Sequence, residues 1–432
     1  MNTAYYWMRL ACWSVSFCLL LSLLDCRPAL ALQPDTALAG QIKAQLQAKK
    51  KLPLYFPRSV KRFYGRRDFK PVWLISEKDE TGHAWQAMML LDCVLQYGLS
   101  HADYHPDELT YGVLHDIVEL PGKISAERQA RFELMLTDAM LTLMAHLHYG
   151  KLNPELPALQ VDAGRGDMHL ETVLAQALSR QAIDETLLAV QPKGQAYQEM
   201  QRWMHKWKGQ YLDDCYEVPE ASVRKVAINM ERLRWAAIGS GPYLQVNIPS
   251  FTLSLFLPDT TYQFKIVAGR PATPTPLLQS RVFAIDAPAK TVWPDQLQTI
   301  RLIPESMQNS ALRFAFSSHY NVSLKALNGS DWFRRKQRAL TRGDVGIENA
   351  DKLAALLLSA DHQGNKIELL RRSRLTGKAA TVSLHTPMPI KITYLTCWFQ
   401  DAQLMDYPDI YQLDTRLEQA IYHELPKKLA MP

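Results

Sequence analysis

The chain changes character at Val223–Trp235, which reads VRKVAINMERLRW. The apolar residues of this stretch recur at the three- and four-residue spacing of an amphipathic helix. After it come short runs of β-branched and aromatic residues separated by Pro, Gly, Ser and Asn, a pattern typical of strands joined by turns. The position of this helix therefore predicts an α+β chain, with a helical first part and a β-rich second part.

The residues before this stretch predict an α-helical domain. Glu127–His148 has the strongest helical pattern, and Gly150 and Pro154 after it are typical of a helix end. The aromatic residues of Val60–Leu74 predict a compact unit. Further helices are expected at Ala37–Lys51, Trp85–Tyr97, Leu170–Leu178, Asp184–Val190 and Tyr197–Lys208.

The residues after it predict a β domain. We expect one helix inside this domain at Ala350–Leu358 and a closing helix at Leu413–His423. Strands are expected at Tyr243–Ile248, Thr252–Phe256, Tyr262–Ala268, Arg281–Ile285, Ala311–Phe316, Asn321–Leu324, Thr381–Ser383 and Lys391–Trp398. The expected division is a helical domain over 32–221, a β domain over 222–380 and a strand and helix tail over 381–432.

The composition excludes some classes of protein. The chain has 432 residues, of which 47% are hydrophobic and 21% charged, so it is long enough for several cores and is not disordered. Its net charge of +6 would suit an anionic envelope polymer, but ordinary surface charge is the favoured explanation. No dense Lys/Arg block indicates nucleic-acid binding.

The first 31 residues have the pattern of a secretory signal peptide. Arg9 precedes the apolar segment Leu10–Leu24, and Ala29-Leu30-Ala31 provides a small-x-small cleavage site. We therefore expect a mature chain that starts at Leu32, in the periplasm, without a transmembrane anchor. Cys26 raises the alternative of a lipoprotein, but Asp25 stands where a small residue is expected.

The remaining cysteines predict neither a disulfide framework nor a metal site. Cys93, Cys215 and Cys397 are odd in number, widely spaced and without a CxxC pair. His146 and His148 are two residues apart on a helix and so face different sides. The sequence has no HExxH, nucleotide glycine loop or GxSxG, so we expect no metal and no cofactor.

Motifs in a fixed order carry a family resemblance over nearly the whole mature chain. The most specific of them is Asn229–Trp235, and the others are Arg62–Tyr64, Pro71–Trp73, Gln96–Leu99, Asp103–His105, Leu136–Ala139, Gly150–Pro154, Gln245–Pro249, Val267–Pro271, Pro389–Tyr394 and Asp409–Tyr411. The chain resembles the large, YcbB-type L,D-transpeptidases, periplasmic enzymes that crosslink peptidoglycan stem peptides. The resemblance implies a scaffold domain, a YkuD-type β domain, and a tail that packs back on the scaffold.

The loop inside Arg335–Leu358 departs from that family. Where the family has Ser/Thr-His-Gly-Cys, an apolar residue and Arg, this chain reads TRGDVG over residues 341–346. By resemblance, Asp344 stands for the nucleophilic Cys, Arg342 for its His, and Gly346 for the Arg. Lys325 stands where the family has another His, after the expected strand with Tyr320–Val322. The residues retained around the loop are Thr341, Gly343, Glu348 and Asn349.

Two segments are also shorter than the family pattern. Trp207–Glu220 leaves no room for the small peptidoglycan-binding module that usually precedes the Asn229–Trp235 helix, and Ala284–Gln298 stands where a longer lid is usual.

These substitutions remove the chemistry that the family uses. Acyl transfer through cysteine needs a thiolate with a base or ion-pair partner, and Arg342 cannot act as a base. We expect Asp344, Arg342 and Lys325 to share one pocket as an ion-pair cluster, with a basic group within about 4 Å of Asp344. Neutral drift of an unused site is the alternative interpretation.

The sequence therefore predicts a protein without enzymatic activity that acts in cell-wall biology. Its expected partners are peptidoglycan stem peptides or a cell-wall enzyme that it modulates. One alternative is an active L,D-transpeptidase or carboxypeptidase with non-standard residues. A second alternative is a structural envelope protein that binds no peptide.

Overall fold

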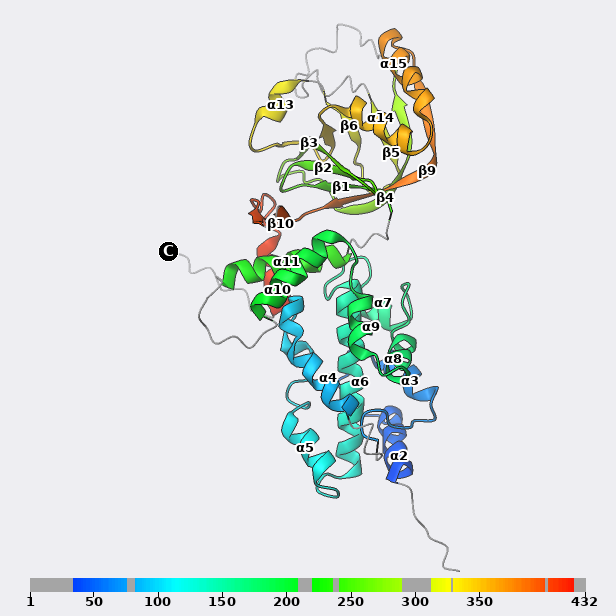
Figure 1. Ribbon diagram of the computed structural model, residues 1–432, viewed down its shortest axis with the longest axis vertical. Helices are drawn as coiled ribbons and strands as arrows, with labels where there is room; N and C mark the ends of the chain where they lie inside the picture. Colours follow the sequence, from blue (N-terminus) through cyan, green and yellow to red (C-terminus); the bar gives the residue numbers. More distant parts are fainter. Residues whose placement is uncertain are drawn as a thin grey trace, which may run out of the picture.

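The computed structural model describes residues 34–75, 82–208, 220–235, 241–289, 312–327, 329–400 and 403–422. A helical part lies at one end of the molecule and a sheet at the other (Figure 1). The expected signal peptide, Cys26 and Cys215 lie outside the described residues, as do most of the two shortened segments.

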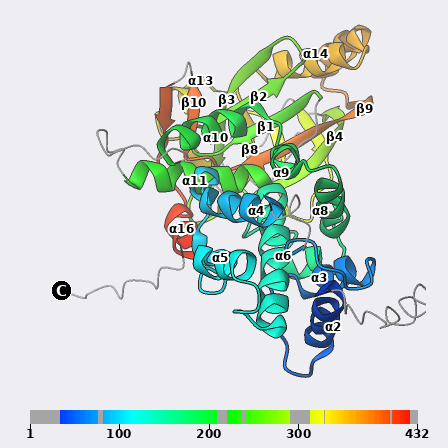
Figure 2. The same ribbon diagram turned by 60° about the horizontal axis from the view of Figure 1, so that its bottom comes forward.

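The helical part is built around α6 (Ala126–Tyr149), whose side chains are buried along most of its length. The helices α2 (Pro34–Gln47), α3 (Pro57–Gly65), α4 (Gly82–Asp92), α8 (Leu170–Ser179) and α9 (Ile183–Val190) pack against it (Figure 2). The shorter elements are η1 (Val94–Tyr97), η2 (His101–Asp103), α5 (Tyr111–Glu119) and α7 (Ala158–Asp162). The predicted helices are confirmed, with Trp85–Tyr97 divided between α4 and η1.

A buried carboxylate holds the aromatic unit against α6. The Glu133 side chain accepts hydrogen bonds from the backbone amides of Val72, Trp73 and Leu74 and from the Tyr64 hydroxyl. Complete burial raises the pKa of Glu133, although these donors oppose the shift. The segment before α4 therefore needs no regular secondary structure, because one side chain satisfies its amides.

The second part is a nine-stranded sheet in the order β2-β1-β9-β4-β5-β6-β8-β3-β7. Its strands are β1 (Tyr243–Asn247), β2 (Thr252–Phe256), β3 (Thr261–Gly269), β4 (Leu278–Ala287), β5 (Arg313–Phe316), β6 (Leu324–Ala326), β7 (Ala339–Thr341), β8 (Val345–Ile347) and β9 (Ala380–Thr393). The helices α14 (Ala350–Ala360) and α15 (Ile367–Thr376) contribute apolar side chains to its core, and α13 (Ser330–Arg334) precedes β7. The α+β class is confirmed.

Three of the predicted strands are wrong in their limits. Residues 321–323 are not in a strand, and β6 begins only at Leu324. The separate strands expected at Thr381–Ser383 and Lys391–Trp398 are instead β9, which pairs with β1 and β4, and β10 (Cys397–Gln400). In the sequence, Pro387 and Pro389 resemble a break between two strands, although β9 is one continuous strand. They are tolerated because β9 has an irregular register with β4 at this point and pairs with β1 only from Ile390.

The expected domain limits move accordingly. The limit at 380/381 is wrong, because β9 lies inside the sheet and the tail begins after Thr393. The limit at 221/222 falls inside α11 (Glu220–Trp235), which packs on α10 (Gln195–Lys208) and α6. Residues up to Trp235 therefore belong with the helical part.

The tail packs back on the helical part, as predicted. It consists of β10, β11 (Gln403–Asp406) and α16 (Asp414–Tyr422). Leu395, Cys397 and Phe399 share a buried cluster with side chains of α10 and α11, and α16 lies against α11. The Lys151 ammonium, 2.7 Å from the carbonyl oxygen of Ile421, ties the end of α16 to the scaffold.

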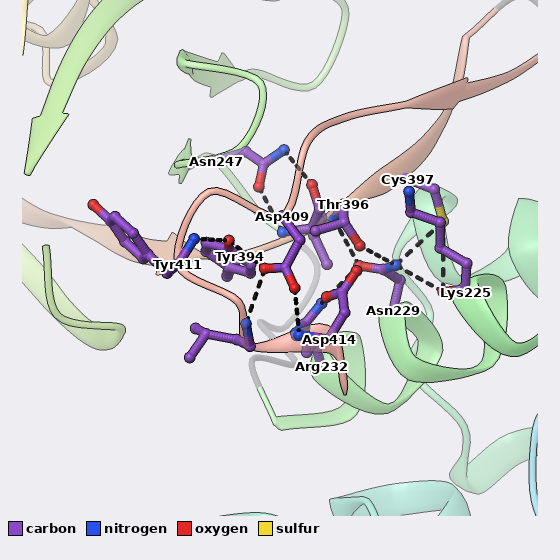
Figure 3. A network of polar contacts seen from close by, with 12 residues as sticks. Lys225, Asn229, Arg232, Asn247, Tyr394, Thr396, Cys397, Asp409, Tyr411 and Asp414 are labelled. Carbon is purple, nitrogen blue, oxygen red and sulfur yellow. Dashed lines mark hydrogen bonds and ion pairs between the residues drawn. The ribbon is translucent and has the colours of Figure 1, made fainter. Parts of the chain in front are cut away.

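Two asparagines join the tail to both parts of the molecule (Figure 3). The Asn229 amide of α11 accepts a hydrogen bond from the Thr396 backbone amide and donates one to the Thr396 hydroxyl. The Asn247 amide of β1 binds the backbone N–H and C=O of Leu395 in the same way. Adjacent tail residues are thus fixed to the helix and to the sheet, so the tail orients one part against the other.

Candidate functional site

The loop Arg342-Gly343-Asp344 connects β7 to β8. Gly343 has φ +105°, in the region that favours glycine, so the retained glycine makes the tight connection possible. The Thr341 hydroxyl donates a hydrogen bond to the Asp344 carbonyl and closes the turn. Since β8 runs parallel to β6, the Asp344 side chain reaches the residues at the start of β6.

Three donors surround the Asp344 carboxylate. Lys325 Nζ lies 2.6 Å from Oδ2, while the Ser323 backbone N–H and hydroxyl lie 2.9 and 2.8 Å from Oδ1. The Lys325 and Asp344 side chains are 16% and 32% exposed, so solvent screens the pair only in part. The predicted ion pair with Asp344 is confirmed, through Lys325.

The surroundings fix the charge of Asp344. Partial burial raises the pKa of its carboxyl, but the hydrogen bonds from Lys325 and Ser323 outweigh this, and the resulting pKa lies below the ordinary value. The group is therefore an ionised acceptor at neutral pH and holds no proton to donate.

Arg342 does not join this pair, so the predicted cluster of three is wrong in this respect. The side chain of Arg342 is exposed and forms no ion pair with any described residue. It lies on the other side of the Gly343 turn from Asp344 along the chain, which leaves its guanidinium at the rim of the loop.

The other expected site residues shape the strand and the turn after it. A Cβ added to Gly346 would lie 3.0 Å from Leu327 Cδ2, so an arginine there would require Leu327 to move. The Glu348 backbone N–H donates to the Lys265 carbonyl. Asn349 adopts φ +55° immediately before α14, and its carbonyl accepts the first amides of that helix. None of the three makes a hydrogen bond or ion pair to Asp344 in the described part of the chain.

Hydrogen bonds also connect the tail to the β7–β8 loop. The Tyr411 hydroxyl, shown in Figure 3, donates to the Gly269 carbonyl at 2.6 Å and accepts from the Thr275 amide. The neighbouring Arg270 amide donates to the Thr341 carbonyl at the start of the loop. Two successive hydrogen bonds, through the adjacent residues Gly269 and Arg270, therefore connect Tyr411 of the tail to the β7–β8 turn.

Comparison with known proteins agrees with this architecture. A family model described as "Scaffold domain" matches residues 58–204, the helical part. A curated protein of Haemophilus influenzae named "Putative L,D-transpeptidase" is 25% identical over 255 residues, which cover 48% of this chain and 51% of that protein. The chain thus spans about half the length of this curated relative.

The predicted resemblance to the large, YcbB-type L,D-transpeptidases is confirmed by these two matches. Within the described residues, Cys93 and Cys397 are the cysteines, and both are free. Cys397 lies in β10 against Asn229, and burial raises its pKa to about 12. Cys93 follows α4 in the scaffold, and burial raises its pKa as well. Neither has the depressed pKa of a nucleophilic thiol.

Ser323 is the site residue that the sequence interpretation missed. It immediately precedes β6, and its position beside Asp344 depends on where that strand begins, so no local sequence pattern identifies it. Among the described residues, no group of His, Cys, Asp and Glu is arranged to hold a metal ion, and no helix is long and apolar enough to span a membrane.

Proposed function

We propose that this chain is a catalytically inactive L,D-transpeptidase homologue that is exported to the periplasm and takes part in peptidoglycan biology by binding stem peptides. The observation that carries the proposal is the state of Asp344. At the loop position of the family's nucleophile, a carboxylate accepts hydrogen bonds from Ser323 and Lys325 on both of its oxygens.

The chemistry of that arrangement argues against acyl transfer. A carboxylate that attacked a peptide carbonyl would form a mixed anhydride, and its attacking lone pair would first have to leave Lys325 or Ser323. Among the described hydrogen bonds and ion pairs of Asp344 there is no neutral base to move a proton. Loss of the nucleophile alone lowers enzyme rates by several orders of magnitude.

Binding is favoured over a purely structural role by the exposed Arg342. Its guanidinium stands at the rim of the loop without an ionic partner among the described residues, so it is available to bind a carboxylate bidentately. Peptidoglycan stem peptides carry such carboxylates. Modulation of a cell-wall enzyme is the second form of the proposal, because the same rim could receive an acidic side chain of a partner.

The test combines acylation with peptide binding. The wild-type protein should gain no mass on treatment with meropenem, yet it should bind a purified stem tetrapeptide in a calorimetric titration. Arg342→Ala should weaken that binding about tenfold, as expected for loss of one charge-assisted contact. Arg165→Ala, an exposed arginine of the scaffold, is the matched control and should leave the affinity unchanged.

The two alternatives give different results. An active enzyme with non-standard residues would form a covalent drug adduct. A structural envelope protein would form no adduct and would bind no tetrapeptide, and modulation of an enzyme would then have to be sought with partner proteins.

A further inference from the structure

Helix α15 has an exposed face with no partner in the described structure. The helix reads IELLRRSRLT and lies at the end of the sheet part farthest from the helical part (Figure 1). Leu370 and Ser373 face inward, and Leu370 belongs to the core beneath the sheet. The proposed peptide site does not use the opposite face.

Apolar and cationic side chains alternate on that outer face. At 100° per residue, Arg371, Leu375, Arg372 and Leu369 follow one another around a single arc of the helix. Leu375 is 74% exposed and Leu369 46% exposed, although burial of a leucine is worth about 1.5–3 kcal/mol. Two exposed leucines within one arc of a short helix make an apolar stripe, whereas a scattered single leucine would need no explanation.

The charge around this stripe is strongly positive. The segment 366–378 contains five cationic residues and one acidic residue, Glu368. Arg371 and Arg372 share Glu368 at 3.9 and 3.3 Å, and these three side chains are exposed, so solvent screens both ion pairs. Lys366 and Lys378, at the two ends of the helix, form no ion pair with a described residue.

We propose that the outer face of α15 docks on the surface of an anionic phospholipid bilayer. Interleaved leucines and cations are the composition of helices that lie in the membrane interface, where apolar side chains enter the acyl boundary and cations meet phosphates. A hydrophilic polyanion such as the cell wall would account for the cations and would leave both leucines in water. The observations therefore favour lipid as the partner.

A cavity beside the helix fits the same partner. It has a volume of about 310 Å³ and lies between α14 and α15, with an apolar lining that includes Ala354, Leu358 and Leu370. Arg371 and Arg374 also line it, and Arg374 pairs with Asp351 of α14. An apolar space bordered by guanidinium groups suits an acyl chain beneath a phosphate.

Vesicle sedimentation tests the proposal with the exported chain, its N-terminus verified by intact mass. The protein should sediment with phosphatidylcholine vesicles containing phosphatidylglycerol and remain in solution with phosphatidylcholine alone. Arg371→Ala/Arg372→Ala should raise the half-saturating lipid concentration about 30-fold, since each cation near an anionic surface contributes about a factor of five. Leu375→Asn should raise it several-fold.

Matched controls separate this face from general charge and apolarity. Lys49→Ala/Lys50→Ala removes the same charge from an exposed part of the scaffold, and Leu159→Asn replaces a leucine that is 73% exposed. Both control proteins should bind the anionic vesicles like the wild type. Equal losses in control and α15 variants would overturn the proposal, as would an absence of vesicle binding at low salt. Sedimentation with purified peptidoglycan sacculi that requires the α15 arginines, without vesicle binding, would assign the face to the wall polymer instead.

Discussion

Arg232 of α11 and Asp414, the first residue of α16, form an ion pair in which Nη1 lies 2.6 Å from Oδ1. The Arg232 side chain is buried, and its guanidinium also lies over the Tyr394 ring. Two segments separated by most of the β part of the chain are thus joined at a point with little water. The pair helps to fix the sheet relative to the scaffold.

Arg232→Ala should destabilise the protein by about 3–5 kcal/mol, because it leaves the Asp414 carboxylate without its cation in a poorly hydrated site. Urea unfolding measures the change. Arg334 and Asp331 form an exposed ion pair of α13, so Arg334→Ala should cost less than about 1 kcal/mol. Similar losses of stability for both variants would show that the Arg232–Asp414 pair contributes no more than an exposed ion pair.

Two glycines should respond to alanine in opposite ways. Gly98 has φ +67°, and a Cβ there would lie 2.8 Å from the Ala227 Cα, so Gly98→Ala should destabilise by about 3 kcal/mol or more and separate η1 from α11. Gly40 lies in α2 with no atom near the added Cβ, so Gly40→Ala should stabilise by about 0.5–1 kcal/mol. Thermal unfolding distinguishes the two, and a neutral Gly98→Ala would show that the contact is loose.

The stability that comes from the Lys325–Asp344 pair should depend on pH in one direction. The pKa of Asp344 is lowered in the folded state, so its contribution is present above the unfolded carboxyl pKa of about 3.9 and disappears as the pH falls through the folded value. Asp344→Asn should therefore cost about 1–2 kcal/mol at neutral pH and progressively less in acid. A cost that persists unchanged below the folded pKa would mean that the packing of Asn, and not the charge, is responsible.

Cys397 should be unreactive in the folded protein. Burial raises its pKa to about 12, so at about pH 8 its thiolate population is lower than that of an ordinary thiol by a factor of about 10³. Iodoacetamide followed by peptide mapping should find Cys397 unmodified in buffer and modified in urea. Rapid modification of Cys397 in the folded protein would show that its thiol is accessible and reactive, and would make it a candidate nucleophile.

The sequence predicted the elements whose pattern is local. Glu127–His148 became α6 and Thr252–Phe256 became β2, because the helical spacing and the strand alternation of their apolar residues directly reflect one buried face. Helix α15 was missed, since its exposed leucines and arginines obscure the helical period. The limits of β9 were missed, since its two prolines resemble a break and only the partner strands explain them.

The sequence predicted only those site residues that the family resemblance identifies. The Asp344–Lys325 pair followed from the replaced residues and their charges. Ser323 did not, because its two hydrogen bonds depend on where β6 begins, which the sequence placed too early. The outward position of Arg342 depends on the Gly343 turn, whose φ no charge pattern specifies.

Restoring the family's residues should restore part of the chemistry. The variant Asp344→Cys/Arg342→His/Lys325→His should be acylated by meropenem, because a strained ring needs mainly a nucleophile and an oxyanion site. It should not crosslink peptides, since two substrates must be held in register and Leu327 occupies the space beside Gly346. A folded variant that resists acylation would show that the shape of the loop has diverged as well as its residues.

Intact-mass spectrometry of the wild-type protein after treatment with meropenem tests the central claim most directly. An ionised Asp344 held by Lys325 and Ser323 offers no nucleophile, so the mass should remain that of the untreated chain. A gain of one drug mass, mapped to a residue of the loop 341–346, would contradict the account and identify an active acyl-transfer enzyme.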